Sequence, residues 1–246
     1  GHDDTVFAVA FNADGTVLVS GGGDGKIHLW QVRTGALIAT QSGHTAGITA
    51  IAVAPTHQPK GEEDAAFQYA SAGKDGQVQL WSSTALTPLR TLRAQTARLF
   101  ALAFHPDGAT LFAGGADQTI LRWSVTTGAV LQRLTAVGHQ ILSLACTTNT
   151  LAAGTGEHKI CLWDLQTGKL QTPLTGPTDG IQALAFAGNH VLVSGSFDQT
   201  IRLWDLQRGH PIRIHYGCRN RILALALQPH GRLLADSSMD GVLTFW

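Results

Sequence analysis

Six tryptophans recur at a nearly constant spacing along this chain, and they are all the tryptophans that it has. They are Trp30, Trp81, Trp123, Trp163, Trp204 and Trp246, separated by 51, 42, 40, 41 and 42 residues. Five of them follow an Asp by six residues, and the sixth follows Glu157 at the same distance. A recurrence of about 40–45 residues is typical of repeat proteins. The spacing therefore predicts six copies of one structural unit.

Each unit is predicted to consist of short β-strands. In the second repeat, residues 48–53, 69–72, 78–81 and 89–92 form period-2 runs that Gly, Asp and Pro separate. No stretch shows a sustained helical period. A lone four-stranded sheet cannot bury both its faces, whereas sheets stacked around an axis bury both and protect their edges. We therefore expect an all-β fold, a β-propeller of six four-stranded antiparallel blades.

The repeats predict a single domain with six parts. Their approximate bounds are 1–42, 43–92, 93–134, 135–174, 175–215 and 216–246. The first five parts each contain four predicted strands, but the sixth stops at Trp246 after its third. We expect the last blade to lack its outer strand in this chain, and a longer protein to supply it. Whether the intact ring has six or seven blades is left open.

The second repeat is longer than the others because it carries a polar insertion between its first two strands, at about residues 56–66. Polar stretches between strands are usually exposed loops. A tolerated surface loop is the favoured interpretation, with a docking site as the alternative.

The repeated residues resemble those of the WD-repeat β-propeller family over the whole chain. Gly-His pairs open the first two repeats at His2 and His44, an Asp stands in the turn before the third strand, and a Trp ends that strand. Trp163-Asp164 and Trp204-Asp205 carry the dipeptide that names the family. The resemblance implies a propeller fold and, by analogy only, a role in protein interaction.

In that family a buried network joins the opening His, a strand Ser or Thr, the turn Asp and the Trp. A buried indole N–H needs an acceptor, and an imidazole relays between a hydroxyl and a carboxylate. The resemblance implies two complete networks and part of a third. Their residues are His2, Ser20, Asp24 and Trp30 in repeat one, His44, Ser71, Asp75 and Trp81 in repeat two, and Ser194, Asp198 and Trp204 in repeat five.

The other repeats lack network residues. Repeat three has Gln95 and Ala113 at the His and Ser positions, and repeat four has Val137 and Ala153. In repeat five Pro177 replaces the His, while repeat six offers Cys218 and Asp236. Each missing hydrogen bond forfeits about 1 kcal/mol of net stabilisation, so we expect blades three and four to be the softest.

Composition disfavours several classes of function. The 17 basic and 17 acidic side chains cancel, so no net charge draws the chain to nucleic acid or to a membrane. The basic residues around the start of repeat six (Arg208, Arg213, Arg219 and Arg221) are diluted by apolar neighbours, and we expect a solvated rim there. Three cysteines fit a reducing compartment, so we expect a cytoplasmic protein with no cofactor.

Candidate catalytic and metal motifs have structural explanations. The Ser, His and Asp sets occur twice, where one nucleophile would suffice, and the Trp in each set explains them as hydrogen-bond chains. Residues 21–26 resemble a phosphate loop, but Ser20 and Ile27 stand where Gly and a hydroxyl residue are required. Cys146 and Cys161 lie on non-adjacent predicted strands. We expect no enzyme activity and no metal.

One positional pattern favours partner binding. In the family resembled, the turns before the third strand and the loops before the first strand surround the upper mouth of the channel. Large apolar and basic side chains recur at these positions, as a peptide-docking surface requires. They are Phe7, Lys74, Arg98, Phe100, Leu142, Phe197, Arg221, Leu223 and Met239. The alternative is that the strand residues among them pack between blades. The exposure of their side chains decides between the two interpretations.

The sequence as a whole favours a non-catalytic scaffold that binds a peptide or partner domain on this top face. The alternative is a structural or regulatory module within a larger multidomain protein. The identity of the partner and the oligomeric state are not encoded in the repeat pattern.

Overall fold

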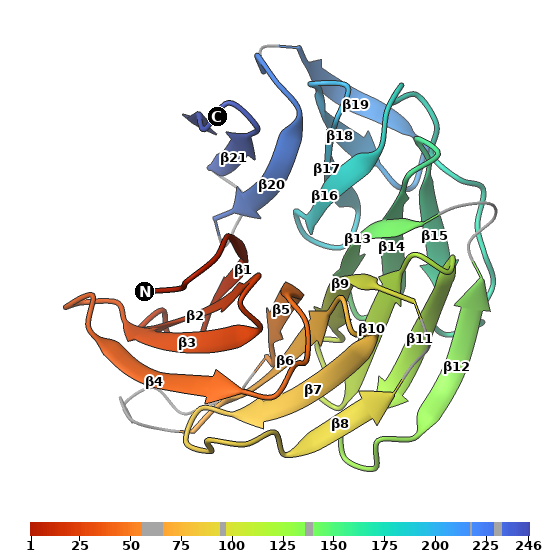
Figure 1. Cartoon of the computed structure of the whole chain (residues 1–246). Coiled ribbons are helices and arrows are strands. Elements are labelled where there is room, and N and C mark those ends of the chain that lie inside the picture. Colours follow the sequence, from red (N-terminus) through yellow and green to blue (C-terminus); the bar gives the residue numbers. More distant parts are fainter. Residues whose placement is uncertain (56–65, 94–96, 136–139, 217, 229–232) are drawn as a thin grey trace. The chain divides into compact units, whose positions relative to one another are not determined.

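The computed structural model describes residues 1–55, 66–93, 97–135, 140–216, 218–228 and 233–246, and this part is all-β. Its strands form six small antiparallel sheets, the blades of a β-propeller, as the sequence predicts. Each blade is a meander in which neighbouring strands along the chain pair with each other (Figure 1). Within the described ranges no helix is long and apolar enough to cross a membrane.

The chain divides into two compact units, Gly1–Thr135 and Ala136–Trp246. The first unit holds blades 1 to 3. Their strands are β1 (Val6–Phe11), β2 (Val17–Gly22), β3 (Lys26–Gln31) and β4 (Leu37–Ser42); β5 (Ile48–Val53), β6 (Gln68–Gly73), β7 (Gln77–Ser82) and β8 (Arg90–Arg93); and β9 (Leu99–Phe104), β10 (Thr110–Gly115), β11 (Thr119–Ser124) and β12 (Val130–Thr135). All three blades are four-stranded.

The second unit holds blades 4 to 6. Their strands are β13 (Ile141–Cys146), β14 (Thr150–Thr155) and β15 (Ile160–Asp164); β16 (Ile181–Phe186), β17 (Val191–Ser196), β18 (Ile201–Asp205) and β19 (His210–His215); and β20 (Ile222–Leu227), β21 (Leu234–Ser238) and β22 (Leu243–Phe245). The last blade has three strands, as predicted. The predicted insertion lies, except for Ala66, outside the described residues.

Blade 4 differs from the prediction of four strands. Its sheet contains only β13, β14 and β15, and the segment that follows touches β15 at two isolated bridges, Trp163 with Leu170 and Ile160 with Leu174. Pro173 lies between these bridges and has no N–H to donate. Proline is tolerated on a sheet edge but weakens regular pairing. The outer strand of this blade is therefore interrupted.

The core lies between successive blades, and this explains the residues around each tryptophan. Trp81 of blade 2 packs in one cluster with Ile27 and Leu29 of blade 1. In the second unit, Trp204 packs in the same way with Ile160 and Leu162 of the preceding blade. Neighbouring residues of a strand point to opposite faces. Within a unit, a third strand thus offers its aliphatic residues to the following blade, and the tryptophan of that following blade packs against them.

The turns that join the second and third strands contain a residue with positive φ directly after the acidic residue. Three of these are glycines, such as Gly25 at 72° and Gly76 at 73°. The other three are Gln118 at 67°, His158 at 67° and Gln199 at 69°. L-residues with a side chain adopt this left-handed region at a cost of roughly 1–2 kcal/mol. Three turns therefore hold a strained residue.

Replacing Gln118 with Gly is expected to raise the free energy of unfolding by up to about 1 kcal/mol. The change relieves the left-handed strain, and the greater chain entropy of glycine in the unfolded state offsets part of the gain. Urea denaturation measures the difference. Gln77→Gly, in strand β7, is the control and is expected to destabilise. A loss of stability in Gln118→Gly would contradict the strain argument.

Candidate functional site

Blade 1 joins four side chains from three segments into one hydrogen-bond chain. The Trp30 indole N–H donates to Ser20 Oγ at 2.8 Å, and Ser20 Oγ lies 2.8 Å from His2 Nε2. His2 Nδ1 lies 3.0 Å from Asp24 Oδ2. With the serine hydroxyl donating to the imidazole, His2 Nδ1–H donates to the carboxylate. The chain ties the loop before β1 to strands β2 and β3.

Blade 2 repeats this arrangement almost atom for atom. Trp81 Nε1 donates to Ser71 Oγ at 2.8 Å, Ser71 Oγ lies 2.7 Å from His44 Nε2, and His44 Nδ1 lies 2.9 Å from Asp75 Oδ2. Asp75 also accepts the backbone N–H of Thr45 at 3.1 Å. The structure thus brings together both complete sets named from the sequence.

The surroundings of these groups perturb their pKa values. Burial alone would raise the pKa of Asp24, but the backbone N–H groups of Lys26 and Asp3, together with His2, overcome it and lower the pKa to about 2. Burial lowers the pKa of His44, and the neighbouring Asp75 opposes that shift. The carboxylate of Asp24 is therefore firmly ionised. Ser20 and Ser71 are buried and engaged in these chains, so the two networks act as structural links.

In the first unit, the partner-binding candidates have exposed or half-buried side chains. Phe7 on β1 is 49% exposed, and Lys74 Nζ of the adjacent blade stands 4.7 Å from the centre of its ring. Arg98, just before β9, is exposed, while Phe100 on that strand is half-buried. This cation–π contact between Lys74 and Phe7 links blade 2 to blade 1.

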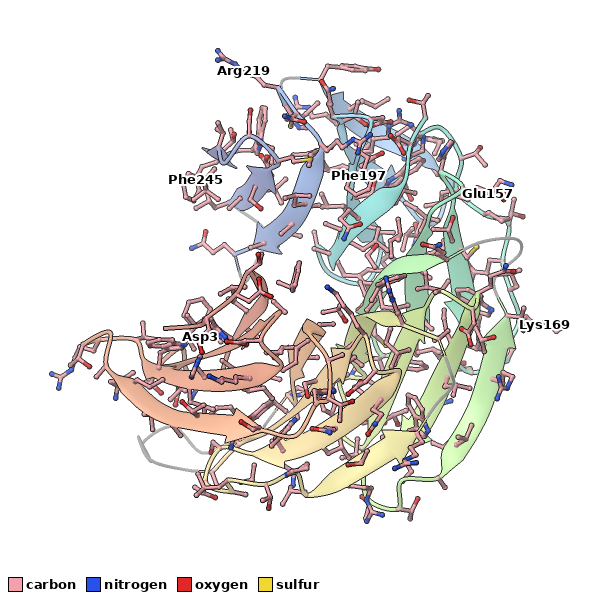
Figure 2. All side chains as sticks on the ribbon, viewed as in Figure 1. Asp3, Glu157, Lys169, Phe197, Arg219 and Phe245 are labelled. Atoms are coloured by element: carbon pink, nitrogen blue, oxygen red, sulfur yellow. The ribbon has the colours of Figure 1, made fainter. Side chains whose placement is uncertain are left out.

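In the second unit, Phe197, labelled in Figure 2, lies directly after β17 and is half-buried. The guanidinium carbon of Arg221 lies 5.3 Å from the centre of the Phe197 ring. Leu142 is half-buried, whereas Leu223 and Met239 are 43% and 62% exposed. The backbone N–H of Met239 donates to the Arg221 carbonyl at 2.9 Å.

Gly180 allows two of these apolar side chains to approach each other. A Cβ at this position would lie 3.0 Å from Leu142 Cδ1 and 3.5 Å from Phe197 Cδ2. Leu142 and Phe197 therefore both pack against the backbone of Gly180, where a side chain would crowd them. We name the set Leu142, Phe197, Arg221, Leu223 and Met239 the second-unit patch.

Comparison with known protein families matches the description "WD domain, G-beta repeat" at five places. The matches cover residues 1–31, 35–82, 86–124, 168–205 and 209–246, more than half of the chain. This chain belongs to the WD40 family. No match covers residues 125–167, which hold the three strands of blade 4 and the exceptional Glu157.

Several named proteins are similar to this WD40 chain. Periodic tryptophan protein 2 of Arabidopsis thaliana is 27% identical over 90% of the chain and 24% of its own length. Protein tipD of Dictyostelium discoideum is 22% identical over 100% of the chain and 40% of its own length. Nuclear distribution protein PAC1 of Arthroderma benhamiae is 28% identical over 82% of the chain and 50% of its own length. The chain thus spans half or less of these relatives.

A solved structure shares the WD40 fold of this chain. The crystal structure of the computationally designed Ika8 protein superimposes with a TM-score of 0.78 at 29% sequence identity. The alignment covers 100% of this chain and 72% of the designed one. Its likeness over the full chain supports the assignment of the fold.

Blade 5 departs from the WD40 network because Pro177 replaces the histidine. The indole of Trp204 still donates to Ser194 at 2.9 Å, and Asp198 still accepts the backbone N–H of Thr178 at 2.9 Å. Arg202 on β18 takes over the missing contact: its Nη2 donates to Asp198 Oδ2 at 3.4 Å, and both side chains are more than nine-tenths buried. A buried ion pair has replaced the His–Asp pair of blades 1 and 2.

The backbone near Pro177 is shaped to admit the arginine. A Cβ at Gly176 would lie 2.5 Å from Arg202 Nη1, and Gly176 has φ of +138°, a conformation that L-residues rarely adopt. The guanidinium therefore occupies space that only glycine leaves free. Sequence reasoning missed Arg202, although it stands two residues before a WD40 tryptophan, on the same face of the strand.

Blade 6 carries an aspartate in place of the network serine. Trp246 Nε1 donates to Asp236 Oδ1 at 2.6 Å, and Asp236 is buried. Cys218 stands near this carboxylate, and burial, together with Asp236 and Asp240, raises the pKa of its thiol to about 11. The thiol is therefore protonated at neutral pH, which makes it a poor nucleophile or metal ligand.

Blades 3 and 4 are expected to exchange their backbone amide hydrogens faster than blades 1 and 2. Ala113 and Ala153 cannot accept the indole hydrogen bond, and each lost bond forfeits about 1 kcal/mol. Native-state hydrogen exchange of β10 and β14, compared with β2 and β6, measures this directly. Finding β10 and β14 the most protected strands of the chain would contradict it.

Proposed function

We propose that this WD40 chain is a non-catalytic protein-interaction scaffold that holds a peptide or partner domain on the top face. By top face we mean the ends of the blades that carry the turns before the third strands. The observation that carries the proposal is the second-unit patch, where exposed apolar side chains surround an arginine stacked on an aromatic ring. Such clusters are typical of binding hot spots.

The chemistry of the patch favours one kind of partner segment. Arg221 is exposed and its guanidinium lies over the Phe197 ring, so its N–H groups can also donate hydrogen bonds to a carboxylate of a partner. Leu223 and Met239 beside it offer apolar area to a side chain of the partner. Phe7 with Lys74 in the first unit repeats the combination of cation and ring. We infer a partner segment that carries both acidic and apolar residues.

Met239→Ala and Arg221→Ala are expected to weaken partner binding by about 30-fold each, the effect of losing a hot-spot side chain. Partners captured by the full-length wild-type protein would be identified first, and their affinities for each variant then measured. Ile212→Ala is the matched control, since Ile212 on β19 is 56% exposed but lies outside the patch. If both variants bind every captured partner like the wild type, the patch is not the binding surface.

A structural or regulatory module inside a larger protein is the second candidate. The chain spans only 24% to 50% of the length of the relatives described above, which supports this alternative. Cross-linking within the full-length protein separates the two candidates. Cross-links from the second-unit patch to another part of the same polypeptide would favour the module, and cross-links to a separate protein would favour the scaffold.

The proposed location of the scaffold is the cytoplasm. The support for this proposal is the small number of cysteines, since reducing compartments keep thiols free. The chain has three cysteines, Cys146, Cys161 and Cys218. Imaging of the full-length protein in its source cells tests the location.

A further inference from the structure

A second histidine lies against the network of blade 1 and takes no part in it. His28 on β3 stands two residues before Trp30 and is 4% exposed. Its ring meets the His2 ring edge to face, with the centroids 4.2 Å apart. Its Nδ1 lies 2.8 Å from Thr40 Oγ1. The two imidazoles and the carboxylate of Asp24 are thus gathered beneath the loop that precedes β1.

One ring nitrogen of His28 makes no hydrogen bond to the described residues. His28 Nε2 is buried and has no hydrogen-bond partner among the described residues. Buried polar atoms are nearly always paired, and each exception calls for an explanation such as a bound ion. If Nδ1–H donates to Thr40, Nε2 carries a lone pair that points into the protein. That lone pair is what a metal ion needs.

The geometry of the cluster fits a metal site. His2, Asp24 and His28 each offer one ligand atom, and these atoms lie within 4.8 Å of one another, a grouping found at no other point in the described ranges. We propose that these three residues bind Zn²⁺, with water in the fourth position. Zinc takes imidazole and carboxylate ligands at about 2.0–2.2 Å, so tetrahedral ligands stand about 3.4 Å apart. The widest separation between ligand atoms, within 4.8 Å, must therefore shorten by up to about 1.4 Å, whereas His2 Nδ1 and Asp24 Oδ2 are already 3.0 Å apart.

Binding requires no change in the number of protons. In the network, the proton of neutral His2 lies on Nδ1 and is donated to Asp24. When Nδ1 binds the zinc ion, the proton moves to Nε2, which donates to Ser20 Oγ at the position it already occupies. Ser20 still accepts the indole N–H of Trp30. Thr40 fixes the orientation of His28, as outer partners of zinc-bound histidines usually do.

Access to the site depends on the segment that carries His2. The side chains of His2 and Asp24 are only 3% and 6% exposed, so this segment covers them. It is held by the Asp3 N–H, which donates to Asp24 at 3.0 Å, and by an exposed ion pair between Lys26 and Asp3, a residue labelled in Figure 2. The contacts of His2 with Ser20 and Asp24 and the Gly23 N–H donated to the Thr5 carbonyl also hold the segment, so an ion enters by local opening in which these bonds break.

Blade 2 provides an internal control, because it has the same network without the extra histidine. Gln79 occupies the position of His28, two residues before Trp81, and its Nε2 donates to the Gly43 carbonyl at 2.9 Å. Its Oε1 is buried without a hydrogen-bond partner among the described residues, and glutamine is nevertheless accommodated beside a complete His–Asp pair. The His28→Gln variant recreates in blade 1 what blade 2 already contains, and Gln79→His recreates in blade 2 the proposed site.

Calorimetric titration of the untagged, chelator-treated chain with Zn²⁺ alone tests the proposal. We expect one tight equivalent for the wild type and a loss of more than about 100-fold in affinity for His28→Gln, since even outer partners of zinc ligands contribute 10–100-fold. His210→Gln, which removes an exposed histidine, is the control and is expected to bind like the wild type. Gln79→His is expected to bind a second equivalent.

Two further readouts decide the matter if His28→Gln fails to fold. Co²⁺ bound to the wild type is expected to give the strong visible absorption of a tetrahedral site, and Gln79→His to double it. Equal zinc affinity of folded His28→Gln and wild type would overturn the proposal. Weak binding without a defined stoichiometry, as surface histidines give, would overturn it as well.

Discussion

Asp198→Asn is expected to lower the free energy of unfolding by about 3 kcal/mol. The Thr178 N–H donates to Oδ2 of Asp198 and the Thr200 N–H to Oδ1, so the single oxygen of asparagine keeps only one of these two hydrogen bonds, and the substitution also removes the charge opposite Arg202. The guanidinium, 9% exposed, then lies buried beside Gly176 without a counter-charge. Urea denaturation followed by tryptophan fluorescence measures the loss, since Trp204 lies in the same blade.

A second substitution separates the charge from the packing. Asp198→Asn combined with Arg202→Met removes the unpaired cation and fills its space with an apolar chain, so the part of the loss that the unpaired cation causes is expected to be recovered. Asp3→Asn is the matched control, because the Lys26–Asp3 pair is exposed and screened by solvent; no measurable change is expected. If the Asp198→Asn single variant behaves like Asp3→Asn, the buried pair does not support blade 5.

Trp81→Ala is expected to lower the free energy of unfolding by about 3–5 kcal/mol, as large-to-small changes in a closed core do. Trp81 is 0% exposed, stacks on Tyr69 at an interplanar angle of 10°, and packs with Ile27 and Leu29 of the preceding blade. Its removal also leaves Ser71 without the indole donor. The loss therefore combines a cavity with a broken network.

The same substitution at Trp30 is expected to cost clearly less. Trp30 makes the same 2.8 Å hydrogen bond to its serine but is only half-buried. Blade 2 packs against Ile27 and Leu29, on the face of blade 1 opposite to Trp30, and so does not cover the indole. Chemical denaturation of both variants under identical conditions compares them. Equal losses at Trp81 and Trp30 would show that the hydrogen bond, and not the burial, sets the contribution of these tryptophans.

The positions of the strands along the chain were predictable from its sequence. In repeat two the four predicted runs coincide, within a residue or two at their ends, with β5, β6, β7 and β8. This worked because the alternation of side chains along a strand is a local property, and because each tryptophan marks the same strand of its blade. The interruption in blade 4 was missed, although Pro173 was visible, because a proline on an edge strand is tolerated in many sheets.

The candidate site was predictable only in part. The network sets of blades 1 and 2 could be named because the resemblance supplies their positions, and the structure brings their members within hydrogen-bond distance. The pairing of Phe7 with Lys74 and of Phe197 with Arg221 could not be read from the chain. Residues of neighbouring blades make these contacts, and their side-chain directions depend on how the blades pack.

The sequence by itself determined the six blades of this chain, most of their strands and the turns between them, because a period of about 40 residues repeats the same local choices six times. Only the tertiary structure decided what fills each blade where the pattern breaks. Arg202 takes the place of a missing histidine, and His28 meets His2 and Asp24 across separate strands. Arg202 and Asp198, like His28 and Asp24, are only four residues apart, but each pair also meets a segment 26 residues before the arginine or His28, at Gly176 and at His2. No local periodicity encodes how such separate segments come together.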